Sequence, residues 1–183
     1  MAELNEFRLH PGDRAPEFAL PGTDGKTHRL SDFADRPLFL AVFWCNHCPY
    51  VQAWESRLID LGRTYGPKGV AIVTINSNDA EAYPDDRYEA MARRAQEKQY
   101  PFPYLRDETQ EVARAYGGLV TPHPMLFDRD RRLLFLGRID EDHQHPERVT
   151  HRYLATAIDQ ALAGRKVDPA TLPVVGCTIK WRP

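Results

Sequence analysis

The sequence predicts an α/β protein built on a mixed β-sheet. Residues 38–44 are continuously apolar and residues 70–75 are rich in β-branched side chains, so both ranges are predicted to be buried strands. Between them, apolar residues recur three and four apart over 51–65, which is the pattern of one helix face. This strand–helix–strand unit makes the two strands parallel. Strands at 125–128 and 133–137 flank a charged turn and are expected to form an antiparallel hairpin.

Turn residues and helix periodicity predict the remaining elements. Two short strands near the N-terminus are separated by a turn rich in Pro and Gly, which is typical of a hairpin. The prolines in Tyr100–Pro103 favour a loop or an edge strand there. Glycines end two of the later helices. The predicted ranges are strands 17–20 and 26–30, a helix that follows Pro84 and has Asp85 or Asp86 as its cap, and helices 108–116 and 147–163.

Length and charge restrict the class of protein. The 183 residues predict one domain over 1–183, with a core at about 9–163 and a C-terminal tail at 164–183. The formal net charge of −2 argues against binding of nucleic acid or an acidic membrane through bulk charge. The longest apolar run is much shorter than a bilayer span and no secretory signal is recognisable, so we expect a cytoplasmic protein without membrane contact.

Two of the three cysteines lie three residues apart, where the first buried strand gives way to a helix. The first turn of a helix stabilises a thiolate, which is the form of cysteine that attacks a disulfide, so we expect Cys45 to be activated there. Cys48 can then close a disulfide with it. A positive charge on His47, between them, lowers the pKa of the first thiol further. Half of a zinc site has the same spacing, as do inert buried cysteines, but the strand–helix–strand context favours redox chemistry.

Several segments resemble a known family. The run Phe43–Pro49 resembles the active-site junction of thioredoxin-like proteins. The opening segment Pro11–Leu20, with Asp24–Lys26 and Leu30–Phe33, resembles the redoxin (AhpC/TSA) branch, which contains TlpA/ResA-like thiol–disulfide oxidoreductases. The resemblance covers about residues 9–163. It implies a thioredoxin-like fold with a central mixed β-sheet, helices on both faces and an N-terminal β-hairpin extension.

The same resemblance implies the roles of individual residues. Cys45 is the expected nucleophile, Cys48 the resolving thiol, and Pro122 a cis-proline whose neighbouring backbone pairs with an incoming peptide. No cofactor and no metal are implied, because the electrons reside in the dithiol. The implied partners are a disulfide-bearing protein or a small thiol substrate, and a cellular reductant. Residues expected to line the substrate groove are Trp44, Asn46 and Thr121.

A thiol peroxidase is the main alternative enzyme. Peroxiredoxins of the redoxin branch resemble Thr-x-x-Cys-Pro, and Cys48-Pro49 matches the end of that motif while Cys45 replaces the threonine. The peroxidase also needs an arginine just before the hairpin strand, where this chain has Pro122. Both departures favour disulfide exchange over peroxide reduction.

A copper-binding protein similar to Sco is the non-enzymatic alternative. It requires two cysteines and a distant histidine as ligands. Sco-like sites space their cysteines one residue wider than this chain does, which argues against this alternative. The histidines that keep it open are His123, His143, His145 and His151.

Cys177 lies in a separate tail motif, Gly176–Trp181, beyond the last predicted helix. One hypothesis makes it a third redox thiol that folds back toward Cys45 or pairs with a partner. The other, which we prefer, makes it a small apolar side chain in a tail that packs on the body of the protein.

Two acidic residues near the expected site are not assigned a catalytic role. Asp79 and the amides of 76–78 follow the second parallel strand and emerge at the same sheet edge as Cys45, where they could line the site, but we prefer a capped loop as the explanation. Glu55 lies beyond the first turn of the predicted helix. We therefore do not expect Glu55 to move the proton of the resolving thiol.

Overall fold

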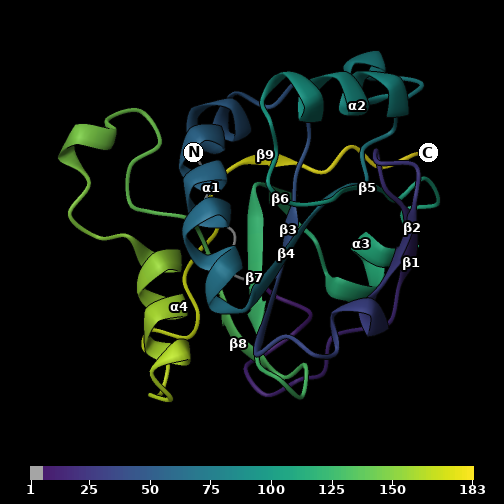
Figure 1. Ribbon diagram of the computed structural model, residues 1–183. Coiled ribbons are helices and arrows are strands. Elements are labelled where there is room, and N and C mark those ends of the chain that lie inside the picture. The colour runs from purple at the N-terminus through teal and green to yellow at the C-terminus, as the bar shows by residue number, and fades with distance from the viewer. Residues whose placement is uncertain (1–5) are drawn as a thin grey trace.

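The central sheet of the protein has five strands in the order β5-β4-β3-β7-β8. The computed structural model describes residues 6–183, so residues 1–5 of the domain expected over 1–183 lie outside the described part. β3, β4 and β5 are parallel, and β7 is antiparallel to both β3 and β8, which confirms the mixed sheet (Figure 1). The strands are β3 Leu38–Phe43, β4 Val70–Asn76, β5 Tyr104–Arg106, β7 His123–Phe127 and β8 Leu133–Leu136.

Helices lie on both faces of this sheet, as predicted. α1 (Pro49–Tyr65) and α4 (Tyr153–Leu162) bury their apolar sides on one face, and α2 (Tyr88–Glu97) adds Met91 to the same layer. α3 (Glu111–Tyr116) covers the other face together with the N-terminal segment. That segment contains the predicted hairpin, formed by β1 (Ala19–Pro21) and β2 (Thr27–Arg29). The α/β, thioredoxin-like architecture is thus present in full.

The last helix begins later than predicted, at Tyr153 rather than Glu147. Pro146–Arg148 forms only a short 3₁₀ turn, and the chain is then held in a non-helical path by a side chain. The carboxylate of Glu141 accepts the backbone N–H groups of both Thr150 and His151. A helix that began at Glu147 would have used these two N–H groups for its own backbone hydrogen bonds.

Two more elements lie at positions that the prediction did not give. Tyr100–Pro103 forms a loop, which was one of the two predicted possibilities, and the edge strand follows it at Tyr104–Arg106. α3 starts at Glu111 instead of residue 108, because Gln110 adopts a left-handed backbone with φ of 63°. Neither shift changes the order of the elements.

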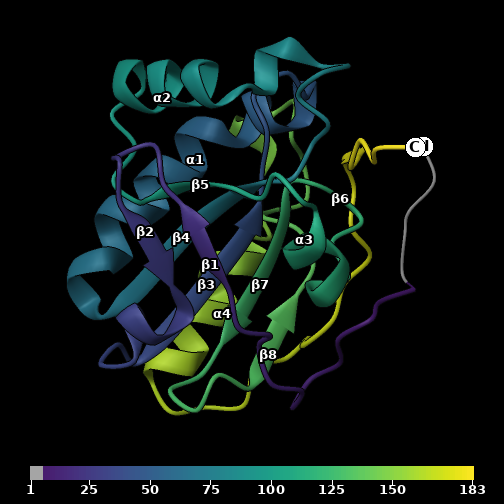
Figure 2. The same cartoon turned by 90° about the vertical axis from the view of Figure 1, so that its right-hand side faces the viewer.

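The C-terminal tail folds back along the molecule. It first runs beside β8, where Thr171 bridges Leu136. It then forms β9 (Cys177–Thr178), which is antiparallel to β6 (Val120–Thr121). Figure 2 shows this yellow segment passing from β8 toward β6. The pairing opposes Cys177 to Thr121, so the tail motif meets the residue that precedes Pro122.

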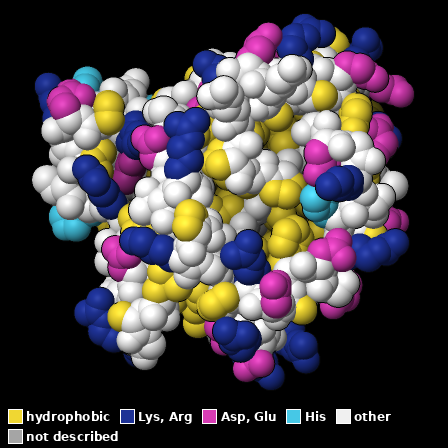
Figure 3. Space-filling model, in the orientation of Figure 1, with side chains coloured by type: hydrophobic (Ala, Val, Ile, Leu, Met, Phe, Trp, Pro, Cys, Tyr) yellow, Lys and Arg dark blue, Asp and Glu magenta, His cyan; other side chains and the backbone are white. Residues whose placement is uncertain are grey.

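The surface shows charges of both signs. On the face drawn in Figure 3, Lys and Arg side chains alternate with Asp and Glu side chains and leave no large patch of one sign. This distribution agrees with the small net charge of −2. Within residues 6–183, no helix combines the length and the apolar character needed to cross a bilayer.

Candidate active site: three thiols at the end of β3

The loop between β3 and α1 places Cys48, and not Cys45, at the start of the helix. α1 begins at Pro49 and Cys48 is its N-cap, whereas the sequence placed Cys45 in the first helical turn. Proline is favoured at the first helical position because it has no N–H to leave unpaired. The preceding residues Asn46 and His47 form a bend that is held by bonds to other parts of the chain. The helix N-terminus therefore acts on the second cysteine of the motif.

Both sulfurs of the pair are fully buried and contact the same residue. Cys45 and Cys48 are each 0% exposed, and both are free thiols. The Cys45 Sγ lies 3.1 Å from the hydroxyl oxygen of Thr121. The Cys48 thiol donates to the carbonyl oxygen of Thr121 over 3.2 Å. The Thr121–Pro122 bond is cis, as predicted, so the cysteines and this bond lie side by side.

The surroundings of the two sulfurs shift their pKa values in opposite directions. The pKa of Cys48 is lowered to about 5 by its hydrogen bond with Cys45 and by the N–H of Val51, against the effect of burial. The pKa of Cys45 is raised by the hydrogen bond with Cys48, by burial and by the charge of Asp86. Of the two thiols, Cys48 is therefore the one that loses its proton more readily, because its interaction with Cys45 and nearby backbone N–H groups favour a negative charge there.

Asp86 is the residue of the site that the sequence did not identify. Its side chain is 0% exposed and, instead of capping α2 as predicted, lies under the cysteine loop. It accepts the backbone N–H of Asn46 over 2.6 Å and lies 2.5 Å from Nδ1 of His47. The side-chain amides of Asn76 and Asn78 donate to the two oxygens over 3.0 and 2.9 Å. A buried carboxylate thus fixes the loop between the cysteines.

The polar segment after β4 supports this carboxylate and the tail. Its amides at 76 and 78 bind Asp86, and Asn78 Oδ1 also accepts the backbone N–H of Lys180. Asp79 receives a backbone N–H at residue 81 and donates its own N–H to the carbonyl of Lys180. The segment therefore reaches the sheet edge that holds the cysteines, and Asp79 acts there as a loop cap and tail contact.

All three residues expected to line a substrate groove are interior, and Thr121 is 2% exposed. Trp44 is 0% exposed, and its indole N–H donates to the hydroxyl of Tyr100. Asn46 is 6% exposed, gives its amide hydrogen to the carbonyl of Asp85 and accepts the hydroxyl of Tyr104. Both side chains are bound within the protein because the loop turns inward, so they support the loop and do not face a groove.

Glu55 takes part in an ion pair away from the sulfurs. Its two oxygens accept the guanidinium of Arg94 over 2.7 and 3.0 Å, and Tyr100 donates to it over 2.6 Å. Lys98 lies 3.9 Å away. The charge of Glu55 is therefore compensated by cations, and no contact links this carboxylate to the sulfurs.

One group of side chains near the cysteines has the composition of a metal site. Ligand atoms of Cys45, His47 and Asp86 all lie within 4.8 Å of one another. A thiolate, an imidazole and a carboxylate suit Zn²⁺ and several other transition metals. In the structure the imidazole of His47 is already bound to Asp86 and stacks on Tyr83 at 5.1 Å between ring centroids.

The histidines that a Sco-like copper site would need lie elsewhere. His123 is buried between Phe7 and Phe43, on the other face of the sheet, and burial lowers its pKa to about 3. Its Nδ1 accepts the backbone N–H of Leu119. His143 packs on the ring of Tyr50 in α1, whereas His145 and His151 lie beside carboxylates of their own region, Glu147 and Glu141.

Cys177 lies against Cys48. The strand pairing sets Cys177 opposite Thr121, whose carbonyl accepts the Cys48 thiol, and Cys177 packs against the apolar cluster that contains both other cysteines. Burial and the neighbouring Cys48 raise the pKa of Cys177 to about 12. The tail packs on the body, as one hypothesis expected, and at the same time brings a third thiol to the pair, as the other did, although to Cys48 and not to Cys45.

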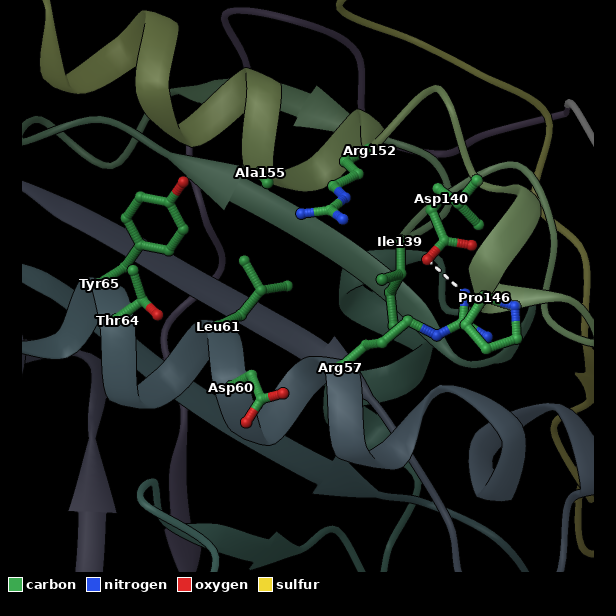
Figure 4. A pocket seen from close by; sticks show the side chains of 11 residues that line it. Arg57, Asp60, Leu61, Thr64, Tyr65, Ile139, Asp140, Pro146, Arg152 and Ala155 are labelled. Atoms are coloured by element: carbon green, nitrogen blue, oxygen red, sulfur yellow. Dashed lines mark hydrogen bonds and ion pairs between the residues drawn. The ribbon is translucent and has the colours of Figure 1, made fainter.

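A separate cavity of about 340 Å³ lies between α1 and the segment before α4. Figure 4 shows Arg57 reaching from α1 toward Asp140, with Arg152 on the opposite wall. Arg57 donates to Asp140 over 2.5 Å, so the guanidinium group of Arg57 is already paired with a carboxylate. None of the three cysteines lines this cavity.

Known proteins resemble this chain in sequence and in structure. Residues 11–142 match the model of the AhpC/TSA family. The thiol-disulfide oxidoreductase ResA of Bacillus thuringiensis subsp. konkukian is 24% identical over 131 residues, which is 70% of each protein. The crystal structure of an uncharacterized conserved protein from Geobacillus kaustophilus is 43% identical, with a TM-score of 0.93 over 100% of this chain and 98% of that one.

A more distant structure shows the fold alone. Peroxidoxin BcpB of Mycobacterium tuberculosis is 19% identical, with a TM-score of 0.63 over 85% of this chain and 96% of the other. The family match spans most of the chain and includes the cysteine loop and the cis bond at Pro122. The chain belongs to the AhpC/TSA family of redoxins and has a thioredoxin-like fold.

Proposed function

We propose that this protein is a thiol–disulfide oxidoreductase that exchanges a Cys45–Cys48 disulfide with disulfides or thiols of proteins or small molecules. The observation that carries the proposal is the placement of both buried sulfurs against Thr121, beside the cis bond to Pro122. The pKa values of the two thiols are also shifted in opposite directions. Two titratable groups with opposed pKa values are typical of groups with different chemical roles. The family and its ResA relatives support a redox activity of this kind.

The positions of the sulfurs suggest an order of events. Cys48, as the ionised sulfur, attacks one sulfur of a substrate disulfide, and the other substrate sulfur leaves as a thiolate. Cys45 then loses its proton and attacks the Cys48 sulfur, which forms the Cys45–Cys48 disulfide and expels the reduced substrate. This order reverses the one that the family resemblance implies, because α1 starts at Cys48.

Trapping of a mixed disulfide tests the order. Two variants, Cys45→Ser and Cys48→Ser, are made in a Cys177→Ser background, so that each retains one thiol. We expect the variant that keeps Cys48 to form a stable mixed disulfide with disulfide-bonded insulin peptides at neutral pH. The variant that keeps Cys45 should form little of this mixed disulfide. The opposite result would restore Cys45 as the attacking thiol.

A redox titration tests the function itself. We expect the wild-type pair to titrate as one two-electron couple in a glutathione buffer, with formation of the Cys45–Cys48 disulfide. A reduction potential of about −270 mV would indicate a reductant, and one of about −120 mV would indicate an oxidant. Purified protein that holds stoichiometric zinc or copper and forms no disulfide would refute the proposal in favour of the site at Cys45, His47 and Asp86.

Peroxide reduction is the second candidate. Cys48 precedes Pro49 at the helix start, which is how the peroxidatic Thr-x-x-Cys-Pro motif ends. Hydrogen peroxide consumption by the Cys45→Ser variant is the discriminating assay, since a peroxidase of this type needs only Cys48 for the first step. We expect slow consumption, because Pro122 stands where the peroxide-binding arginine is expected. Rapid turnover would favour the peroxidase.

A further inference from the structure

The three thiols gather around one residue, Thr121, and differ in exposure. Cys45 and Cys48 are 0% exposed, whereas Cys177 is only partly buried. The hydroxyl of Thr121 lies 3.1 Å from the Cys45 sulfur, its carbonyl accepts the Cys48 thiol, and β9 pairs Cys177 with it. A reagent that approaches the pair from solvent along the tail therefore meets Cys177 first.

The tail is held in place by specific bonds. The backbone N–H of Lys180 donates to Asn78 Oδ1, and its carbonyl accepts the side-chain amide of Gln110, both over 2.9 Å. Gly176 allows a close approach, because a Cβ there would lie 2.3 Å from the carbonyl oxygen of Thr121. That carbonyl also accepts the Cys48 thiol. These contacts fix the position of the tail and hold Cys177 close to Cys48.

We propose that Cys177 is a third redox thiol, which carries the disulfide of the buried Cys45–Cys48 pair to the surface. This inference rests on the disulfide exchange proposed above. The Cys177 thiolate attacks the Cys48 sulfur of the Cys45–Cys48 disulfide. The Cys48–Cys177 bond forms, the Cys45–Cys48 bond breaks, and Cys45 leaves as a thiolate that takes up the proton released by Cys177. The number of disulfides in the chain stays the same.

An external thiol then completes the transfer. Its thiolate attacks the Cys177 sulfur, forms a mixed disulfide there and expels Cys48 as a thiolate. A second external thiol releases Cys177 and leaves an external disulfide, so two electrons have entered the protein. In the oxidised pair Cys48 carries no charge, which removes one of the causes that raise the pKa of Cys177.

A disulfide map of the Cys45→Ser variant gives the first test. After treatment with oxidised glutathione and acid quenching, a tryptic peptide that ends at Arg57 contains Cys48, and one that ends at Lys180 contains Cys177. We expect these two peptides to be joined in most molecules. Wild-type protein should show mainly a loop within the first peptide, with a minor joined species. The Cys48→Ser variant should show little joining of Cys45 to Cys177.

A matched variant controls for the presence of a thiol in the tail. The Cys177→Ser, Thr178→Cys double change moves the thiol by one residue along β9, to a position that is exposed. Neighbouring side chains of a strand point to opposite sides. We therefore expect the joined peptides to disappear when this double change is combined with Cys45→Ser. Equal joining in both backgrounds would mean that any tail thiol reacts, which would overturn the inference.

The rate of reduction gives the second test. We expect glutathione to reduce the oxidised Cys177→Ser protein about tenfold more slowly than oxidised wild-type protein, because the buried pair loses its surface thiol. Equal reduction rates for the two proteins, together with a Cys45→Ser map that shows only glutathionylated Cys48, would overturn the role of Cys177. The proposed function of the Cys45–Cys48 pair would then remain. Failure of wild-type protein to form the Cys45–Cys48 disulfide at all would overturn both.

Discussion

The two cysteines of one short motif lie in opposite electrostatic surroundings. Cys48 is the N-cap residue of α1, and its pKa is lowered by its interactions with the thiols of Cys45 and Cys177 and with nearby backbone N–H groups. Cys45 lies one bend earlier, near the buried carboxylate of Asp86, which disfavours one. Sulfurs that are so close would titrate together in a uniform medium. The interaction of the two thiols with each other is the largest cause of the difference, and burial and the charge of Asp86 add to the cost of ionising Cys45.

The largest expected effect is on ionisation of the thiols. Thiolate absorbance at neutral pH should correspond to one ionised thiol per chain, and Cys48→Ser should abolish it. The pKa of Cys48 is lowered from 9.0 to about 5, so its contribution to the stability of the reduced protein is fully present above pH 9. That contribution is lost as the pH falls through about 5. A thiolate that persists in Cys48→Ser but disappears in Cys45→Ser would reverse the comparison.

Removal of the charge at Asp86 should bring the two sulfurs closer together in pKa. Asp86→Asn is expected to lower the pKa of Cys45 and to raise the reduction potential of the pair, because a stabilised thiolate favours the reduced form. It should also lower the free energy of unfolding by about 3 kcal/mol, since several bonds to a buried charge are weakened. Urea denaturation and glutathione titration measure the two effects.

Glu55→Gln is the matched control for that variant. It removes a second buried carboxylate whose charge is compensated by Arg94 and which does not contact the sulfurs. We expect a loss of about 2 kcal/mol in stability, because the Arg94 side chain is 21% exposed and part of its charge stays solvated. The reduction potential should not change. An equal shift in both variants would mean that general loosening, and not the charge of Asp86, acts on Cys45.

A smaller effect is expected at His47. His47→Phe keeps an aromatic ring for stacking on Tyr83 but removes the bond to Asp86. The carboxylate is then less neutralised, so the Cys45 thiolate becomes less stable and the reduction potential should fall by about 30 mV, equivalent to about 1.4 kcal/mol. The direction is opposite to that of Asp86→Asn. A rise in potential would show that His47 does not act through this carboxylate.

The smallest effect is expected at Thr121, which contacts each sulfur through a different atom. Thr121→Val removes the hydroxyl near Cys45 and keeps the carbonyl near Cys48. The pKa of Cys45 should rise slightly, that of Cys48 should stay the same, and the unfolding free energy should fall by about 1 kcal/mol. Thiolate absorbance of the single-cysteine variants measures the difference. A shift confined to Cys48 would contradict the assignment of these contacts.

The local pattern of the sequence was enough to predict the architecture. The apolar run at 38–44 and the β-branched run at 70–75 are strongly periodic or continuous, so the order of the elements and the parallel pair followed from them. The position of the cysteines between a strand and a helix followed in the same way. The start of the last helix did not, because the carboxylate of Glu141 captures the N–H groups at Thr150 and His151 from the other side of a loop.

The sequence by itself therefore determined which elements form and in which order. It also determined that a pair of cysteines lies between a central strand and the helix that follows it. Only the tertiary structure decided how these cysteines differ and what lies beside them. Asp86 is 38 residues beyond Cys48 in the chain and Cys177 is farther still, and both reach the site through long-range packing and backbone pairing. Such contacts depend on how distant segments meet, which hydrophobic periodicity and helix signals, being local, do not encode.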